Sequence, residues 1–156
     1  MFKASTYFIK EQIPGATISD LINLYKRALK EQSVSNISSN ADTIDFTNDT
    51  FRFVLNKFSN KFSGFSQGQI TIVDEEDEFG VYLRATSTRL FKSAGIIAAV
   101  IILFSLLNSE FTIFPFIIGL VVFILLVITG LVYTSIFFPV YFNSLRNDIE
   151  RELEGQ

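Results

Sequence analysis

Residues 93–141 read SAGIIAAVIILFSLL (93–107), NSEFTIFP (108–115) and FIIGLVVFILLVITGLVYTSIFFPVY (116–141), with Glu110 as their only charged side chain. A bilayer core of about 30 Å needs roughly 20 mostly apolar residues per helix. This stretch is too long for one crossing and suits two helices joined by a short polar turn. We therefore expect a two-helix transmembrane hairpin over residues 89–142, with helices near 90–107 and 115–138.

Basic residues flank this hairpin on one side. Arg84 and Arg89 precede the first expected helix and Lys92 lies at its start. Arg146 and Arg151 follow the second helix, and the turn between the two has neither Lys nor Arg. Cytoplasmic loops of membrane proteins carry an excess of Lys and Arg. The pattern predicts a protein of the cytoplasmic (inner) membrane with both termini in the cytoplasm.

The first part of the chain, residues 1–88, has the patterns of a small folded domain. Residues 1–10 predict a strand, and Pro14-Gly15 breaks the chain after it. Thr17 followed by Asp20 is typical of a capping box, which starts a helix that we expect to end near residue 32. The apolar side chains of this helix recur at three-and-four spacing and predict one buried face: Ile18, Leu21, Ile22, Tyr25 and Leu29.

Alternation with a period of two follows from residue 44 onward. Ile44 and Phe46 alternate with polar neighbours, and residues 51–55 alternate again after the turn residues Asn48-Asp49, which predicts a hairpin whose Phe53 lies in the core. Residues 69–73 and 79–86 flank an acidic run and predict a second hairpin. The Ser- and Asn-rich residues 33–40 indicate a connection or a weak edge strand.

The expected order is therefore β-α-β-β-β-β. Such an order is typical of an α+β domain, a small antiparallel sheet covered on one face by one helix. We expect three parts: a cytosolic α+β domain (1–88), the transmembrane hairpin (89–142) and a charged cytosolic tail (143–156).

Composition excludes several classes of site. The chain has no Cys and no His, which removes disulfides, Cys- and His-based zinc sites, and Ser-His-Asp and Cys-His nucleophile systems. Residues 1–92 contain 11 Lys and Arg against 11 Asp and Glu without a basic block, so no nucleic-acid partner is indicated. No phosphate-binding glycine loop is present, and we expect neither an enzyme nor a cofactor.

The acidic run, Asp74-Glu-Glu-Asp-Glu78, raises the question of calcium. An EF-hand loop places its ligands at alternating positions, with Gly at the bend and a distal Glu. That spacing is missing here, so the run predicts a solvated hairpin turn and no metal site.

Small residues inside the expected spans predict close helix packing. They form two small-xxx-small pairs in the first span, Ala94 with Ala98 and Gly95 with Ala99, and a pair of glycines in the second. The predicted helix-packing residues are Gly95, Ala98, Ala99, Gly119 and Gly130. They either hold the two helices of one hairpin together or join several hairpins.

Residues 56–65, NKFSNKFSGF, allow two interpretations. As a helix, they would place Lys57, Phe58, Lys61 and Phe62 against an anionic membrane surface. As a loop or bent strand, their Phe side chains would complete the domain core.

These features favour a non-enzymatic accessory, anchoring or binding subunit that presents a cytosolic domain at the membrane. Its expected partners are the lipid bilayer and either a larger membrane complex or further copies of the chain. The alternative is a homo-oligomeric pore built from hairpins. Ion pathways normally contain a charged or strongly polar side chain within the membrane, whereas the main polar groups of the second span are the hydroxyls of Thr129, Thr134 and Ser135.

Overall fold

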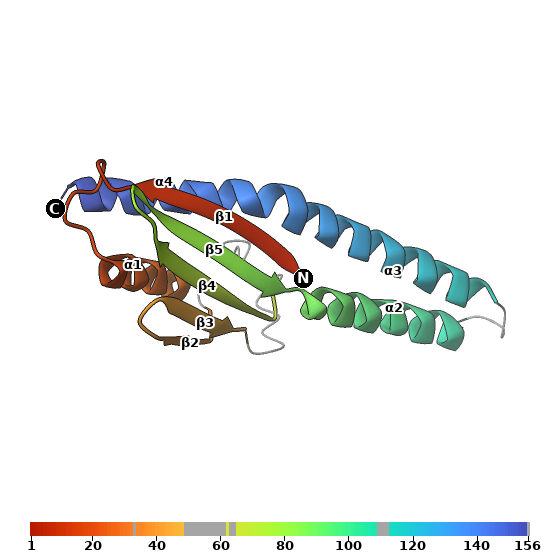
Figure 1. Ribbon diagram of the computed structural model, residues 1–156. Coiled ribbons are helices and arrows are strands. Elements are labelled where there is room, and N and C mark those ends of the chain that lie inside the picture. The colour runs from red at the N-terminus through yellow and green to blue at the C-terminus, as the bar shows by residue number, and fades with distance from the viewer. Residues whose placement is uncertain (33, 49–61, 63–64, 109–112, 156) are drawn as a thin grey trace.

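The computed structural model describes residues 1–32, 34–48, 62, 65–108 and 113–155, and it confirms the α+β class. A five-stranded antiparallel sheet packs against helices, and a long apolar helix leads into the C-terminal part of the chain (Figure 1). The elements in chain order are β1 (Phe2–Ile9), α1 (Ile18–Glu31), β2 (Asn36–Ser39), β3 (Thr43–Thr47), β4 (Gln67–Asp74), β5 (Glu78–Thr86), α2 (Thr88–Asn108), α3 (Phe114–Val132), the π-helical turn η1 (Tyr133–Phe137) and α4 (Phe138–Glu154).

The sheet has the strand order β1-β5-β4-β3-β2. β4 and β5 form the predicted second hairpin around the acidic turn, and β1 pairs along nearly all of β5, from Phe2 opposite Ala85 to Ile9 opposite Glu78. Because side chains alternate across a strand, every second residue faces the core. The core face of the three inner strands carries the buried residues Ile44, Phe46, Ile70, Ile72, Phe79, Val81, Leu83 and Ala85.

The predicted first hairpin, between the strand of Ile44 and Phe46 and residues 51–55, is wrong. β3 pairs with β2 on one side and with β4 on the other, so the Ser- and Asn-rich segment supplies the hairpin partner and both edges of β3 are occupied. The expected partner, residues 51–55 with Phe53, lies outside the described residues. The turn between β2 and β3 is Asn40-Ala41-Asp42, where the Asn40 amide donates to the carbonyl of Thr43 at 2.9 Å.

The predicted helix α1 begins as expected with a capping box. The Thr17 side chain accepts from the Asp20 amide at 3.3 Å, and the Asp20 carboxylate accepts from the Thr17 amide at 2.9 Å. The Thr17 hydroxyl also donates to the Asp20 carboxylate at 2.6 Å. This bond and the one from the Thr17 amide favour the charged carboxylate and lower the pKa of Asp20. Leu21, Tyr25 and Leu29 on the predicted face are fully buried against the sheet.

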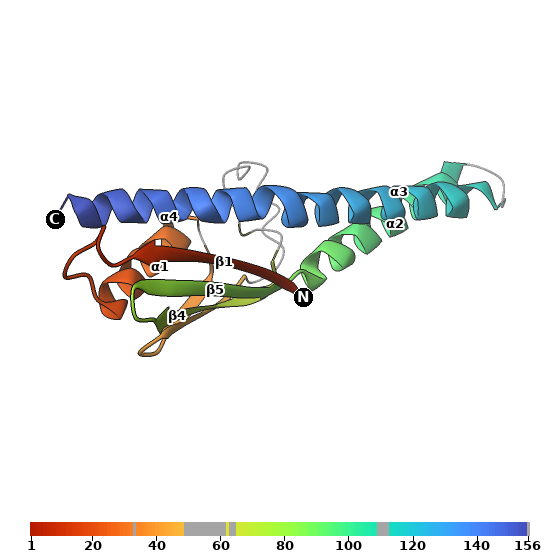
Figure 2. The same cartoon turned by 45° about the horizontal axis from the view of Figure 1, so that its top comes forward.

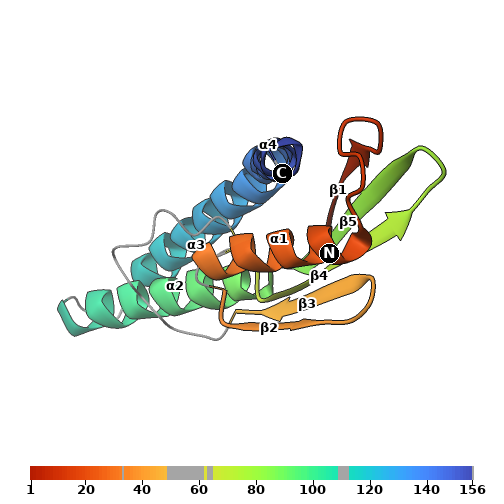
Figure 3. The same cartoon turned by 90° about the vertical axis from the view of Figure 1, so that its left-hand side faces the viewer.

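The C-terminal residues differ from the expected charged tail. Residues 138–154 are helical, and Phe138, Phe142, Leu145 and Ile149 of α4 belong to the same buried core as α1 and the sheet. α4 lies along β1, and α1 lies over β2, β3 and β4, so two helices cover the core face where one was expected (Figure 3). Asp148, Arg151 and Glu154 are exposed on the opposite side of this amphipathic helix. The largely buried Arg146 pairs with Glu150 at 2.7 Å and donates to the Tyr7 carbonyl of β1 at 2.8 Å.

α3, η1 and α4 form one continuous helix of 41 residues, Phe114–Glu154, here called the long helix. At 1.5 Å per residue it is about 60 Å long. Its second half packs on the domain, whereas its first half extends past the end of the sheet beside α2 (Figure 2).

Candidate functional site

The apolar half of the long helix, residues 114–137, is the most unusual surface of the molecule. Leu120, Leu125, Ile136 and Phe137 are each between 58% and 59% exposed, and exposed apolar side chains cover most of the circumference of this half. Its most apolar 18-residue window is only 6% buried, unlike the core helix of a soluble protein. An exposed apolar surface of this extent indicates a partner or a membrane rather than water.

Within the described residues, this helix alone is long and apolar enough to cross a membrane. Residues 114–137 correspond to about 36 Å of helix, against a hydrocarbon core of about 30 Å. The apolar segment of α2 is shorter, Ala94–Leu106. The described residues therefore contain one helix that could span a membrane, and the predicted two-span hairpin is not confirmed.

α2 nevertheless packs along α3. Gly119 is buried at this contact, where a Cβ atom would touch the Ile102 side chain and lie 3.4 Å from the Ala98 carbonyl oxygen. Ala94 and Ala98 are 2% and 7% exposed on the same side of α2. Close approach of two helix backbones is what glycine and alanine permit.

The predicted helix-packing residues therefore divide. Ala98 and Gly119 are brought together between α2 and α3. Ala99 is exposed, and a Cβ at Gly95 would have open space around it among the described atoms. Gly130 lies half-buried in α3.

The threonine hydroxyls of the long helix bond within the helix. The Thr129 hydroxyl donates to the Leu125 carbonyl at 2.8 Å, and the buried Thr134 hydroxyl donates to the carbonyls of Gly130 and Leu131 at 3.0 and 3.1 Å. This is the usual arrangement of hydroxyl groups in apolar helices. These contacts satisfy the hydrogen-bonding capacity of both hydroxyl groups as donors within the helix.

The two halves of the long helix meet at η1 and Pro139. Proline has no amide hydrogen, and its ring clashes with the carbonyl four residues earlier. The preceding wide turn, in which the Phe138 amide donates to the Tyr133 carbonyl, makes room for the ring without ending the helix. We expected the second span to end near Phe138, and the structure instead carries the helix into the domain.

An aromatic cluster fixes this junction to the domain. The Phe138 ring lies 4.7 Å from Phe65, 5.2 Å from Phe62 and 5.4 Å from Phe2, measured between ring centroids and mostly edge to face. Such contacts contribute beyond the area that they bury. Phe138 thus contacts strand β1 and the segment before β4 at the end of the sheet where α2 begins.

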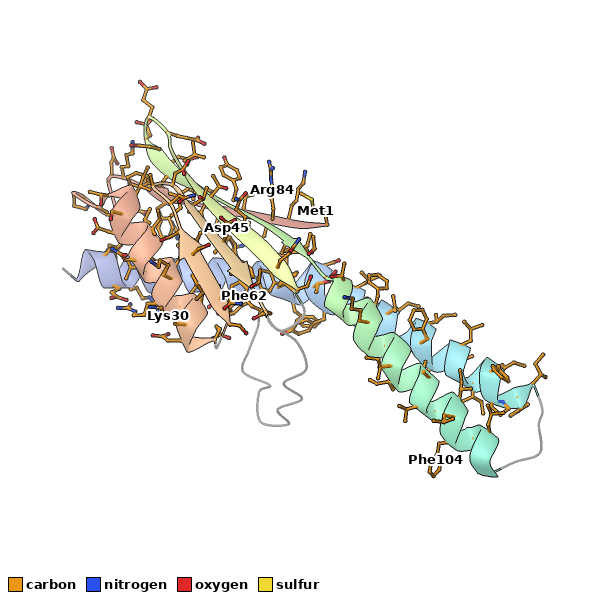
Figure 4. All side chains as sticks on the ribbon, turned by 90° about the horizontal axis from the view of Figure 1, so that it is seen from below. Met1, Lys30, Asp45, Phe62, Arg84 and Phe104 are labelled. Atoms are coloured by element: carbon orange, nitrogen blue, oxygen red, sulfur yellow. The ribbon has the colours of Figure 1, made fainter. Side chains whose placement is uncertain are left out.

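This cluster corrects one of the predicted membrane-surface residues. Phe62 is fully buried, edge to face with Phe46, so it belongs to the core as the alternative interpretation had it (Figure 4). The other three, Lys57, Phe58 and Lys61, lie outside the described residues. The core residues missed in the sequence, Phe138, Phe142, Leu145 and Ile149, follow a spacing of four, three and four that is itself a helical signal.

The acidic turn lies at the opposite end of the sheet. Lys10 forms an ion pair with Asp74 at 2.7 Å, its ammonium group donates to the carbonyls of Glu75 and Glu76, and it lies 5.1 Å from the Phe79 ring centroid. The Tyr82 hydroxyl donates to Glu75 at 3.1 Å. Among the described residues, no group of three or more His, Cys, Asp or Glu side chains is arranged to hold a metal ion.

No protein-family model matches the chain, and neither the curated proteins nor the solved structures include a significant match.

Proposed function

We propose that the chain is a non-enzymatic integral protein of the cytoplasmic (inner) membrane, in which α2 and α3 form a two-span hairpin and the α+β domain stands in the cytosol. The domain would act as an accessory, anchoring or binding subunit. The observation that carries the proposal is the division of the long helix, apolar and exposed over residues 114–137 and built into the domain core over residues 138–154.

The contacts of α2 support the second span. α2 runs back along α3, and it too exposes apolar side chains away from that contact, namely Val100, Leu103 and Phe104 at 59% to 69%. A helix of 21 residues is about 32 Å long, enough for the hydrocarbon core. Lys92 near its start would extend to the interface, as long basic side chains do at helix ends.

The continuity of the long helix supports an anchoring role. Because the same helix would leave the membrane and enter the core without a flexible linker, the domain would be held at a fixed distance and orientation from the bilayer. A partner subunit would then meet a surface with a defined orientation.

Single cysteines test the location, because the chain has none of its own. In intact cells, an impermeant thiol reagent should label Ser109→Cys, between the two helices, and should label Ser38→Cys on β2 only after permeabilisation. The chain should also stay in membranes washed at alkaline pH. Labelling at 38 with none at 109 would invert the orientation, and release by the wash would exclude an integral protein.

Mass measurement after purification in mild detergent tests the role. The proposal predicts a complex with a larger membrane protein or a small oligomer. Conductance by the purified chain in lipid bilayers would instead support the pore.

A further inference from the structure

The outer face of the sheet, which no described helix covers, has an unusual pair of like charges. Lys3 of β1 and Arg84 of β5 stand directly opposite each other, and both are exposed. Directly opposed residues of an antiparallel pair have Cβ atoms about 5 Å apart, and like charges there are destabilising. Neither side chain forms an ion pair with any acidic group that the structure describes.

Arg84 of this pair lines a shallow depression of about 400 Å³ at one end of the sheet, and Lys3 stands opposite Arg84 on β1. Arg84 lines it together with polar side chains of three strands: Asp45, Thr47, Gln67, Gln69 and Thr86. Asp45, on the far side from Lys3, accepts a hydrogen bond from the Gln69 amide at 2.8 Å. Figure 4 shows Arg84 and Met1 beside each other on this face.

The aromatic cluster around Phe138 shows where this depression lies along the axis of the long helix. The Phe2 ring lies 5.4 Å from Phe138, where the apolar exposed half of the long helix ends, and Val140 is 68% exposed just beyond it. Lys3 is the next residue along β1, about 3 Å further from the apolar half. If residues 114–137 cross the bilayer, Lys3 and Arg84 lie at the level of the lipid headgroups.

The charges of the sheet are also distributed unevenly along its length. The acidic turn lies at the other end of β5, six residues or about 20 Å from Arg84. If residues 114–137 cross the bilayer, the basic pair lies at the end of the sheet nearer to it, and the acidic turn lies at the far end.

We infer that Lys3 and Arg84 form a binding site for the phosphate group of anionic lipids in the membrane that holds the protein. This inference rests on the proposed membrane location. A bound phosphate would offset the repulsion between the two cations, and the neighbouring amide and hydroxyl groups of Gln67, Thr47 and Thr86 would accommodate the rest of the headgroup. Basic residues close to a membrane surface each contribute about a fivefold gain in affinity for anionic lipid.

The test uses the full-length chain in detergent, with bound lipid counted by native mass spectrometry during titration with phosphatidylglycerol or phosphatidylcholine. The wild type should prefer phosphatidylglycerol. Arg84→Gln should weaken its binding about fivefold, and Lys3→Gln combined with Arg84→Gln about 25-fold. Arg151→Gln is the matched control, because it removes the same charge from an exposed position near the C-terminal end of α4, and it should leave binding unchanged.

Equal binding by the Arg84→Gln and Arg151→Gln proteins would overturn the inference. Displacement of phosphatidylglycerol by equimolar glycerol phosphate would assign the site to a soluble phosphate compound. That result would overturn the inference that the site binds lipid. Alkaline washing of the same membranes separates the two proposals. A wild type that stays integral but shows no preference for phosphatidylglycerol defeats this inference alone, whereas a wild type that is washed off defeats the proposed function.

Discussion

The two halves of the long helix share one backbone and differ in their surroundings. Residues 114–137 expose apolar side chains on every side except the face that packs against α2, and residues 138–154 bury one apolar stripe in the domain core. A helix that is apolar all round requires an apolar environment on all sides, whereas an amphipathic helix needs one packed face. The difference teaches that one helix can serve two environments when its side-chain pattern changes at a defined point, here Phe138.

Residues 138–154, here called the domain half of the long helix, should give the largest effect of a substitution on the free energy of unfolding. Phe142 is fully buried, with its ring 6.0 Å from Tyr25 and 6.2 Å from Phe138. Phe142→Ala should lower the free energy of unfolding by about 3–5 kcal/mol, because it leaves a cavity between α4 and α1. Leu125→Ala, in the apolar half at 58% exposure, should lower it by less than about 1 kcal/mol. Chemical unfolding in detergent measures both, and similar losses would remove the distinction between the halves.

A smaller effect is expected at the contact between α2 and α3. Gly119→Ile should destabilise the folded chain by about 1–3 kcal/mol, since its side chain must displace Ile102. Gly95→Ile enters open space and is the control. Unfolding and oligomeric mass should be measured together for each variant. If Gly119→Ile leaves both unchanged, close packing of the two helices is wrong, and if Gly95→Ile alone alters the mass, that face joins separate chains.

Tyr25 tests the environment of the domain half through pH. Its hydroxyl is buried without a hydrogen-bond partner among the described residues, and burial strongly raises its pKa. The folded state therefore keeps the proton that the unfolded chain releases near pH 10, so stability is full below pH 10 and falls above it, by at most about 1.4 kcal/mol per pH unit. Tyr25→Phe should be at least as stable at pH 7 and should reduce this fall. An unchanged alkaline profile would contradict the burial of Tyr25.

The smallest effect concerns the end of the domain half. Arg27 of α1 forms an ion pair with Glu152 of α4, and both side chains are partly exposed. Glu152→Gln should lower the unfolding midpoint slightly at low salt, and the difference should disappear near 1 M salt, where exposed pairs are screened. A large loss at high salt would mean that Glu152 contributes to packing beyond its charge.

Local patterns in the sequence predicted much of the fold. The capping box of Thr17 and Asp20, the helix face with Leu21 and Leu29, and the β4–β5 hairpin depend on residues close in sequence, where spacing and turn chemistry are informative. The pairing of β3 was missed because register depends on partners that no local pattern names. The spacing of small residues predicted the packing of Ala98 against Gly119. The same spacing also predicted packing at Gly95 and Ala99, which do not lie at this contact.

The role of α4 was missed for a different reason. Phe138 and Phe142 fall within the expected transmembrane hairpin of residues 89–142, and the charges after them indicated a tail. The same phenylalanine suits lipid and protein core, because both are apolar, and composition alone does not separate them. The signal that separates them is periodicity, which continues from Phe138 through Leu145 to Ile149.

Accessibility along the single long helix tests the central claim most directly. Nitroxide labels on single cysteines at exposed positions of each half, Leu125 and Ile136 in the apolar half and Ser144 and Asp148 in the domain half, should be compared in lipid vesicles by their collisions with oxygen and with a water-soluble nickel complex. The account predicts that oxygen dominates at 125 and 136, that the nickel complex dominates at 144 and 148, and that the change falls between 137 and 144. Dominant collisions with the nickel complex at 125 and 136 as well would contradict it, because the apolar half would then lie in water.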